Sequence, residues 1–172
     1  MRSMLRILVL LTAVGAFCAV GGARAATVRQ LSLKDMSSIA QIVVEGRVES
    51  VQAQWRHRRI FREVQLVADK VIKGPLKPGQ PVTLWVPGGE VGDLGQWVAG
   101  SPEFSVGERV LLFLEANETL GYVVVGMSLG KLRTERDKAG DVWAIRDPVE
   151  GLTAPPLRVS WDLLERTVRT AK

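Results

Sequence analysis

The sequence has very few of the side chains that usually bind metals or carry out covalent catalysis. It contains one cysteine, one histidine and one tyrosine in 172 residues. Cys18 lies in an N-terminal segment that we expect to be removed, so the mature chain has no thiol for a disulfide, a nucleophile or a metal ligand. His57 alone cannot supply the several His or Cys ligands of a zinc site. We therefore expect no metal and no cofactor.

Residues 1–25 have the features of a cleaved secretory signal peptide. Two arginines precede an apolar run over residues 7–20, which is shorter than the about 20 residues of a comfortable membrane span. Residues 23–25 read Ala-Arg-Ala, the A-x-A pattern of a cleavage site. We predict a cut between Ala25 and Ala26, and hence a periplasmic or secreted protein.

The excess of positive charge belongs partly to this leader. The whole chain has 23 basic and 18 acidic residues, and the leader holds three of the arginines and no acid. The mature chain is thus left with 20 basic residues against 18 acidic ones. A nucleic-acid-binding protein would need a stronger and more clustered basic field. We expect a soluble monomer without a nucleic-acid partner and, since no later apolar run is long enough, without a membrane span.

Alternation of apolar and polar residues predicts β-strands through most of the mature chain. Residues 42–51 follow a period of two, and Gly46 inside them indicates a bulge or a close approach of backbone. Residues 60–72 form a second long strand whose apolar face shifts by one residue near its end, as at a β-bulge. Shorter strands are expected at residues 81–86, 110–114 and 122–125, followed by a hairpin of residues 131–134 and 142–145.

Helices are expected only near the two ends of the mature chain. Ser32 is a plausible N-cap for a short helix that reaches Ala40. Ser160 precedes a C-terminal helix with one apolar stripe, made of Trp161, Leu164 and Val168. Five or more strands joined by short turns predict a mainly β fold, a small OB-like β-barrel with a C-terminal hairpin and helix. We predict one domain over residues 26–172.

The strand pattern also predicts which side chains face the core. Eight apolar residues should be buried: Val44, Val48, Val64, Leu66, Leu84, Val86, Leu112 and Leu114. Four polar residues between them should face solvent: Glu45, Arg47, Glu63 and Thr83.

Five segments resemble, in this order, a recurring type of bacterial exported domain of unknown function. They are VVEGRV at residues 43–48, VIKG at 71–74, PGG at 87–89, GERVLLFL at 107–114 and YVV at 122–124. The order is similar, more distantly, to the OB-like domain of tissue inhibitors of metalloproteinases and netrin modules. The resemblance covers about half the chain and implies an OB-like fold.

The more distant resemblance leaves a protease-inhibitor-like module as an alternative function. The metalloproteinase inhibitors chelate the zinc of their target through a disulfide-held N-terminal cysteine. Here Ala26 is the expected N-terminus and the mature chain has no cysteine. An inhibitor-like module would therefore act without cysteine chelation, and no inhibitory residue is transferred.

Two patterns leave a hydrolase as a further alternative. Ser128 and Lys131 match the S-x-x-K dyad, which works on a helix, whereas here the pair lies between predicted strands. His57 stands in a run of arginines at a predicted hairpin tip, without the firm scaffold that a Ser-His-Asp triad needs. We therefore assign no catalytic residue and predict a protein that is not an enzyme.

One candidate binding surface is the predicted hairpin tip at residues 52–59 and the start of the strand after it. It gathers an aromatic residue and four arginines: Trp55, Arg56, Arg58, Arg59 and Arg62. Such surfaces bind anionic polymers by stacking and charge. Because the protein is expected to be exported, we predict an anionic envelope polymer or an envelope protein as the partner. The alternative is a charged tip that only prevents pairing of strand edges.

The second candidate is the glycine-rich segment 88–104 with Trp97. Loops this long without secondary structure are often functional. We expect this one to be ordered, with Trp97 packed against the barrel and the polar residues Glu90, Asp93 and Gln96 facing outward. Its role can be structural, closing one end of the barrel, or it can be a recognition surface. Together the two candidates predict an exported binding or interaction module of the cell envelope.

Overall fold

Strands make up most of the chain that the structure describes, which is residues 31–148 and 156–171 of a computed structural model. The strands are β1 (Ile42–Arg56), β2 (Arg59–Lys73), β3 (Pro81–Pro87), β4 (Gly89–Val91), β5 (Leu94–Gln96), β6 (Arg109–Asn117), β7 (Gly121–Val124), β8 (Lys131–Arg136), β9 (Val142–Arg146) and β10 (Leu157–Ser160). The helices are α2 (Leu33–Ile39), the 3₁₀ turn η2 (Met127–Gly130) and α3 (Trp161–Thr170). The predicted leader and its cut lie outside the described residues.

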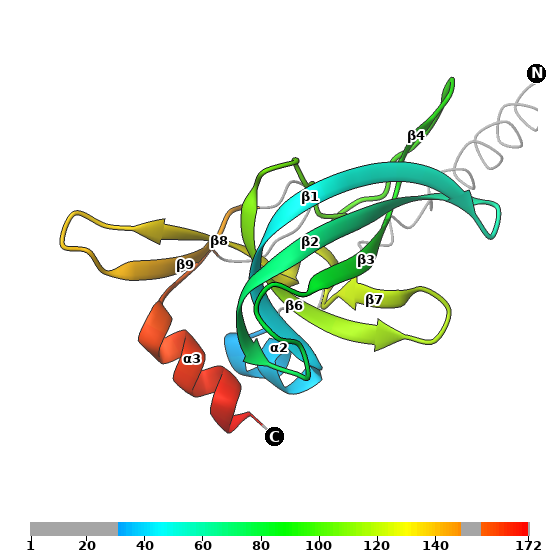
Figure 1. Cartoon of the computed structure of the whole chain (residues 1–172). Coiled ribbons are helices and arrows are strands. Elements are labelled where there is room, and N and C mark those ends of the chain that lie inside the picture. Colours follow the sequence, from blue (N-terminus) through cyan, green and yellow to red (C-terminus); the bar gives the residue numbers. More distant parts are fainter. Residues whose placement is uncertain (1–30, 149–155, 172) are drawn as a thin grey trace, which may run out of the picture.

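Eight strands form one sheet in the order β1-β2-β3-β7-β6-β8-β9-β10, and β4 and β5 form a separate pair (Figure 1). The prediction of a mainly β fold with a C-terminal helix is confirmed, whereas β10 and η2 were not expected from the sequence. None of the helices in the described ranges is both long and apolar enough to cross a membrane.

Strand β1 has hydrogen-bonded neighbours on both of its edges. It pairs antiparallel with β2 along most of its length, and residues 42–47 pair with β6 on the other side. β2 pairs with β3, and β3 meets β7 in parallel at Leu84 and Tyr122. β7 in turn pairs with β6. This long-range pairing holds the central strands in the strongly curved arrangement of Figure 1.

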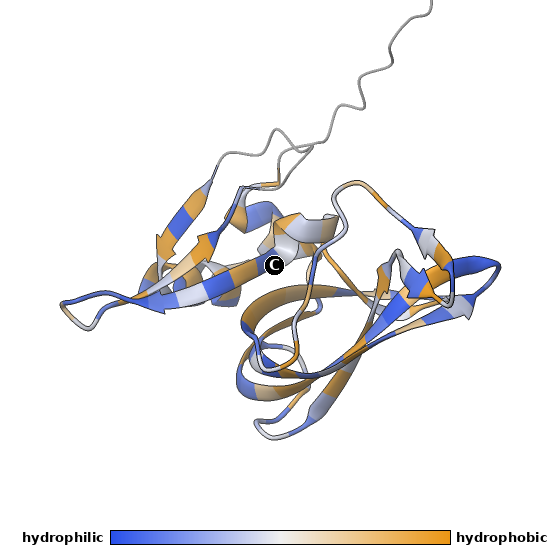
Figure 2. Ribbon diagram, turned by 90° about the horizontal axis from the view of Figure 1, so that it is seen from above, coloured by the Kyte–Doolittle hydropathy of each residue, from blue (hydrophilic) through white to orange (hydrophobic). Residues whose placement is uncertain are grey.

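The apolar residues of the sheet belong to two separate cores. All eight residues predicted to be buried are buried, and they lie in the first core, on the concave side of the central strands. Figure 2 shows hydrophobic residues gathered in these curved strands and hydrophilic ones at the outer ends of the hairpins. The second core packs against the opposite face and contains Met36 of α2, Phe113 of β6 and Leu164 of α3. Strand β6 serves both cores, because its successive side chains alternate between the two faces.

Part of the predicted exposure pattern is wrong. Arg47 and Thr83 are exposed as expected, but Glu45 and Glu63 are half-buried. The face that carries Glu45 is covered by the C-terminal hairpin, and its carboxylate accepts a hydrogen bond from Thr134 Oγ1 at 2.9 Å. Glu63 accepts bonds from the amides of Gln54 and Gln65. The prediction was wrong here because it treated the outer face of these strands as solvent-facing throughout.

The irregular points of β1 and β2 lie where the sequence places them. The β1–β2 register shifts between Glu45 and Gly46, and a Cβ built on Gly46 would lie 2.4 Å from the carbonyl oxygen of Val67. The predicted bulge and close approach are therefore confirmed. The apolar face of β2 also shifts near its end, where Val71 packs against the first core although Ala68 precedes it by three residues.

Both predicted helices form. Ser32 caps α2 with a full capping box, in which its hydroxyl accepts from the Asp35 amide while the Asp35 carboxylate accepts from the Ser32 amide. Ser160 is the N-cap residue of α3, but its side chain makes no capping bond. Leu164 and Val168 of the predicted stripe are buried, and Trp161 packs against the second core. The stripe therefore fixes how α3 sits on the sheet.

We predict that acid weakens the attachment of α3 through Glu165. Its carboxylate accepts from Arg169, from Lys70 Nζ at 3.1 Å and from Trp161 Nε1 at 3.1 Å. These partners, Arg169 first, lower the pKa of Glu165 to about 2 from 4.5. A lowered pKa in the folded state contributes stability above about pH 4.5, and that stability is lost as the pH falls toward 2.

The measurement is urea unfolding of the wild type and Glu165→Gln at pH 7 and pH 3. The variant should be less stable at pH 7 and should lose less stability on acidification. Asp162→Asn is the control, because this exposed carboxylate of the same helix has no ion pair within the described residues. Equal acid sensitivity of the wild type and Glu165→Gln would contradict the prediction.

Candidate functional site

The hairpin of β1 and β2 is longer than predicted and ends in a turn of only two residues. The strands continue to Arg56 and resume at Arg59, so the expected tip over residues 52–59 is wrong in extent. His57 and Arg58 form the turn with φ angles of 48° and 64°. Left-handed conformations cost roughly 1–2 kcal/mol per non-glycine residue, so this turn is tight and strained. It projects from the curved sheet in Figure 1.

The structure divides the predicted arginine cluster into two groups. Arg58 and Arg59 are exposed, and neither has an ion pair within the described residues. Trp55, two residues before the turn, is 51% exposed, and its strand position places it on the opposite face of the hairpin from Arg59. We call Trp55, Arg58 and Arg59 the arginine tip. These three residues remain available to a ligand.

The guanidinium of Arg56 makes its contacts within the protein. Its guanidinium lies 4.4 Å from the centroid of the Trp85 ring and donates to the carbonyl oxygen of Thr119 at 2.7 Å. Thr119 belongs to the turn between β6 and β7, so Arg56 joins two turns that are distant in sequence. Its role is to fix the base of the arginine tip.

Arg62 lies beneath the segment 88–104 and does not belong to the surface predicted for it. Its side chain is 12% exposed. Nη2 donates to Ser101 Oγ and to the Pro102 carbonyl, both at 3.1 Å, and Nη1 forms an ion pair with Glu103. Arg62 shares the inner face of β2 with Val64, and this face is covered by the segment. It therefore holds the segment and is not available to a ligand.

The segment 88–104 is ordered but contains secondary structure that the sequence did not reveal. Strands β4 and β5 form a short hairpin, with Glu90 opposite Gly95. Glu90 and Asp93 are exposed as expected. Gln96 instead turns inward, where its Oε1 accepts from the Ile60 amide at 3.0 Å.

The expected packing of Trp97 against the barrel is wrong. Its side chain is 83% exposed, and Phe104 supplies the buried aromatic residue of this segment. Gln96 occupies the inward position, and successive side chains of an extended chain point to opposite sides. Trp97 is consequently directed outward, which favours the recognition role over the structural one.

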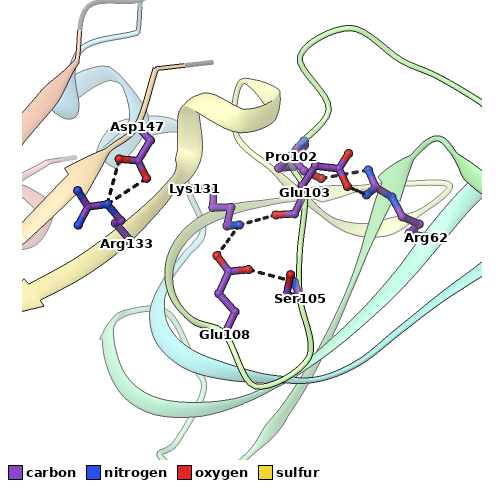
Figure 3. Close-up of polar contacts among 8 residues, drawn as sticks. All are labelled: Arg62, Pro102, Glu103, Ser105, Glu108, Lys131, Arg133 and Asp147. Atoms are coloured by element: carbon purple, nitrogen blue, oxygen red, sulfur yellow. Dashed lines mark hydrogen bonds and ion pairs between the residues drawn. The ribbon is translucent and has the colours of Figure 1, made fainter. Parts of the chain in front are cut away.

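Ser128 and Lys131 both hold the same segment. Ser128 Oγ donates to the Gly100 carbonyl at 2.7 Å. Lys131 Nζ donates to the Glu103 carbonyl and forms an ion pair with Glu108 at 2.7 Å (Figure 3). It also lies 4.6 Å from the centroid of the Phe104 ring. The two side chains of the S-x-x-K pattern thus bond to separate carbonyl groups and not to each other. His57, the other residue of the hydrolase alternative, is exposed in the hairpin turn.

Two adjoining cavities lie on either side of Trp97. The first, of about 370 Å³, lies between residues 97–108 and the C-terminal hairpin. The second, of about 480 Å³, lies between the β4–β5 hairpin and Arg62. Four residues line both cavities and join them: Trp97, Val98, Ser101 and Glu103. We call this double depression the Trp97 groove.

The far wall of the groove was not predicted from the sequence. It contains Arg133, whose Nε donates to both carboxylate oxygens of Asp147 at 2.9 and 3.0 Å (Figure 3). It also contains Arg146, a buried residue whose pKa is lowered by that burial. These residues come from β8, β9 and the chain after β9, far from Trp97 in sequence. The pairing of β8 with β6, and of β9 with β8, brings them to the groove.

No group of three His, Cys, Asp or Glu side chains in residues 31–148 and 156–171 is placed to hold a metal ion. The groove contains an exposed indole, several ion pairs and backbone carbonyl groups that already accept hydrogen bonds from the protein. Comparison with models of known protein families and with curated proteins finds no match for this chain.

Proposed function

We propose that β1, β2, β3, β7 and β6 form an OB-like barrel. Their pairings return to the first strand, because β6 pairs with both β7 and β1, and the one parallel contact joins β3 to β7. In OB-folds, the loops that join the first two and the last two strands flank the ligand-binding face. The corresponding turns here are residues 57–58 and 118–120, and the Arg56 bond to Thr119 joins them.

We infer that the protein is an exported binding module whose arginine tip holds an anionic polymer of the cell envelope. The observation that carries this proposal is that Arg58 and Arg59 are exposed at the end of the hairpin without an ion pair in the described chain, and that the exposed Trp55 lies two residues before the turn. An arginine that is not neutralised within the protein keeps its charge for a ligand, and an exposed indole adds a stacking surface. Export rests on the sequence of residues 1–25.

Arg58→Ala/Arg59→Ala should weaken binding to dextran sulfate, the probe for an anionic polymer. Each exposed ion pair is worth about 0.2–1 kcal/mol, so the loss of two corresponds to roughly two- to thirtyfold in affinity. The measurement is titration calorimetry at several salt concentrations. The double variant should also bind with a weaker dependence on salt, because fewer counterions are displaced.

The matched control is Arg47→Ala/Arg166→Ala. These arginines are also exposed without an ion pair in the described chain, but they lie in the middle of β1 and on α3. The control variant also loses two positive charges, and it should bind nearly as the wild type does. An equal loss in both double variants would mean that net charge alone attracts the polymer. Unchanged binding in both would exclude the arginine tip as its site.

A further inference from the structure

We propose that the Trp97 groove binds the uncharged sugar rings of a polysaccharide. This inference rests on the proposed function and specifies its ligand, a glycan whose anionic groups contact the arginine tip. The groove would then contribute a contact of a different chemical kind, which does not depend on charge.

The groove displays Trp97 on a firmly held segment. Gly100, Pro102 and Glu103 are bonded through their carbonyl groups to the side chains of Ser128, Arg62 and Lys131. Ser101 Oγ also donates to the Pro87 carbonyl at 2.6 Å. Four consecutive residues that begin three positions after Trp97 are thus fixed from four different elements. Tryptophan is one of the residue types most enriched at binding hot spots, and Trp97 is presented to water beside a firmly held segment.

Six of the charged side chains that line the groove form three ion pairs. Arg62 pairs with Glu103, Lys131 with Glu108 at 2.7 Å, and Arg133 with Asp147 at 2.9 Å (Figure 3). Such walls attract neither a polyanion nor a polycation strongly, but they offer donors and acceptors side by side.

Sugar rings match this mixture of an indole face and paired charges. A hydroxyl group both donates and accepts, so it can bridge a guanidinium and a carboxylate. The apolar C–H face of a sugar ring can lie flat on the exposed indole of Trp97, whose amphipathic ring suits a ligand that is apolar on one side and polar on the other. An uncharged saccharide therefore fits the groove better than a charged group does.

The groove and the arginine tip are structurally connected. Gln96, which lines the second cavity, accepts a hydrogen bond from the Ile60 amide at 3.0 Å. Ile60 is the cross-strand partner of Trp55. An extended polymer that reaches from one site to the other would pass over this junction, so both sites can serve one ligand.

The test is a binding assay of the full mature chain on an array of uncharged oligosaccharides that covers hexose and N-acetylhexosamine polymers of both α and β linkage. The wild type should bind at least one of them, and Trp97→Ala should lower that affinity at least tenfold. Its thermal midpoint should be unchanged, because the side chain is 83% exposed. Leu94→Ala is the control, an exposed apolar residue of the same hairpin that lines neither cavity.

Arg58→Ala/Arg59→Ala separates this inference from the proposed function. It should keep its affinity for the uncharged oligosaccharide while it loses affinity for dextran sulfate. The inference is overturned if no uncharged oligosaccharide binds, or if Trp97→Ala binds as the wild type does. It is also overturned if the protein binds none of the oligosaccharides but binds peptides of an unstructured library through Trp97. Loss of dextran sulfate binding in the arginine variant would leave the proposed function standing in each of these cases.

Discussion

Phe113→Ala should destabilise the protein by about 3–5 kcal/mol, the usual cost of truncating a fully buried phenylalanine. Phe113 has no exposed surface and is among the largest side chains of the second core. This core also contains Met36 from α2, near the start of the described chain, and Leu164 from α3, near its end. The cavity left by the change would lie where these helices meet the sheet, and close-packed elements relax only partly into such a space.

Urea unfolding followed by circular dichroism measures this loss. Val106→Ala is the control, because Val106 is an exposed apolar residue just before β6 and its truncation should change stability by less than about 0.5 kcal/mol. Leu112→Ala is the informative companion, since the neighbouring side chain belongs to the first core and should cost about 2–5 kcal/mol. A loss of less than about 1 kcal/mol for Phe113→Ala would mean that the second core is not closely packed.

Gly46→Ala should destabilise the protein by about 3 kcal/mol or more, at the upper end of the cost of overpacking a core. The added Cβ would lie 2.4 Å from both the Val67 carbonyl oxygen and Leu66 Cδ1. The side chain of Leu66 can rotate, but the Val67 carbonyl is backbone in the strand that pairs with β1. Relief of the contact would require β1 and β2 to separate at their bulge.

Gly95→Ala provides a matched control in another strand. A Cβ on Gly95 would meet only Glu90 Cγ, at an ordinary contact distance of 3.6 Å. Neither glycine has a positive φ, so space rather than backbone conformation decides the effect. Gly95→Ala should therefore raise the free energy of unfolding by about 0.4–1 kcal/mol, because it restricts the unfolded chain. Similar effects of the two changes in urea unfolding would show that the approach at Gly46 is not as close as described.

The first core could be predicted from the sequence, and the second could not. Alternation in β1, β2 and β3 identifies one inner face directly, and all eight expected residues are buried. The apolar run at residues 110–114 has no alternation, because both of its faces are covered. Which elements cover the outer face depends on how α2, α3 and the C-terminal hairpin return to the sheet. That arrangement is set by long-range packing and leaves no local pattern.

The sequence predicted several residues of the candidate site, but not which way their side chains point. The sequence identified Trp97 as an unusual residue, yet composition alone could not tell that Gln96 would take the inward position. Arg59 and Arg62 look alike in the sequence, but they lie three positions apart in β2 and face opposite sides, and only Arg62 lies beneath the segment 88–104. The sequence analysis placed residues 52–59 in a hairpin tip, and only the two-residue turn in the structure shows that β2 begins at Arg59.

The meeting of α2 and α3 in one core bears on when the protein can fold. Met36 and Leu164 are separated by most of the chain, and their core also needs Phe113 from between them. A chain emerging from the ribosome cannot complete this core until residues 161–170 have been synthesised. Contacts of such large sequence separation also form slowly, because a long loop must close first. A nascent chain would consequently stay without its second core for most of its synthesis.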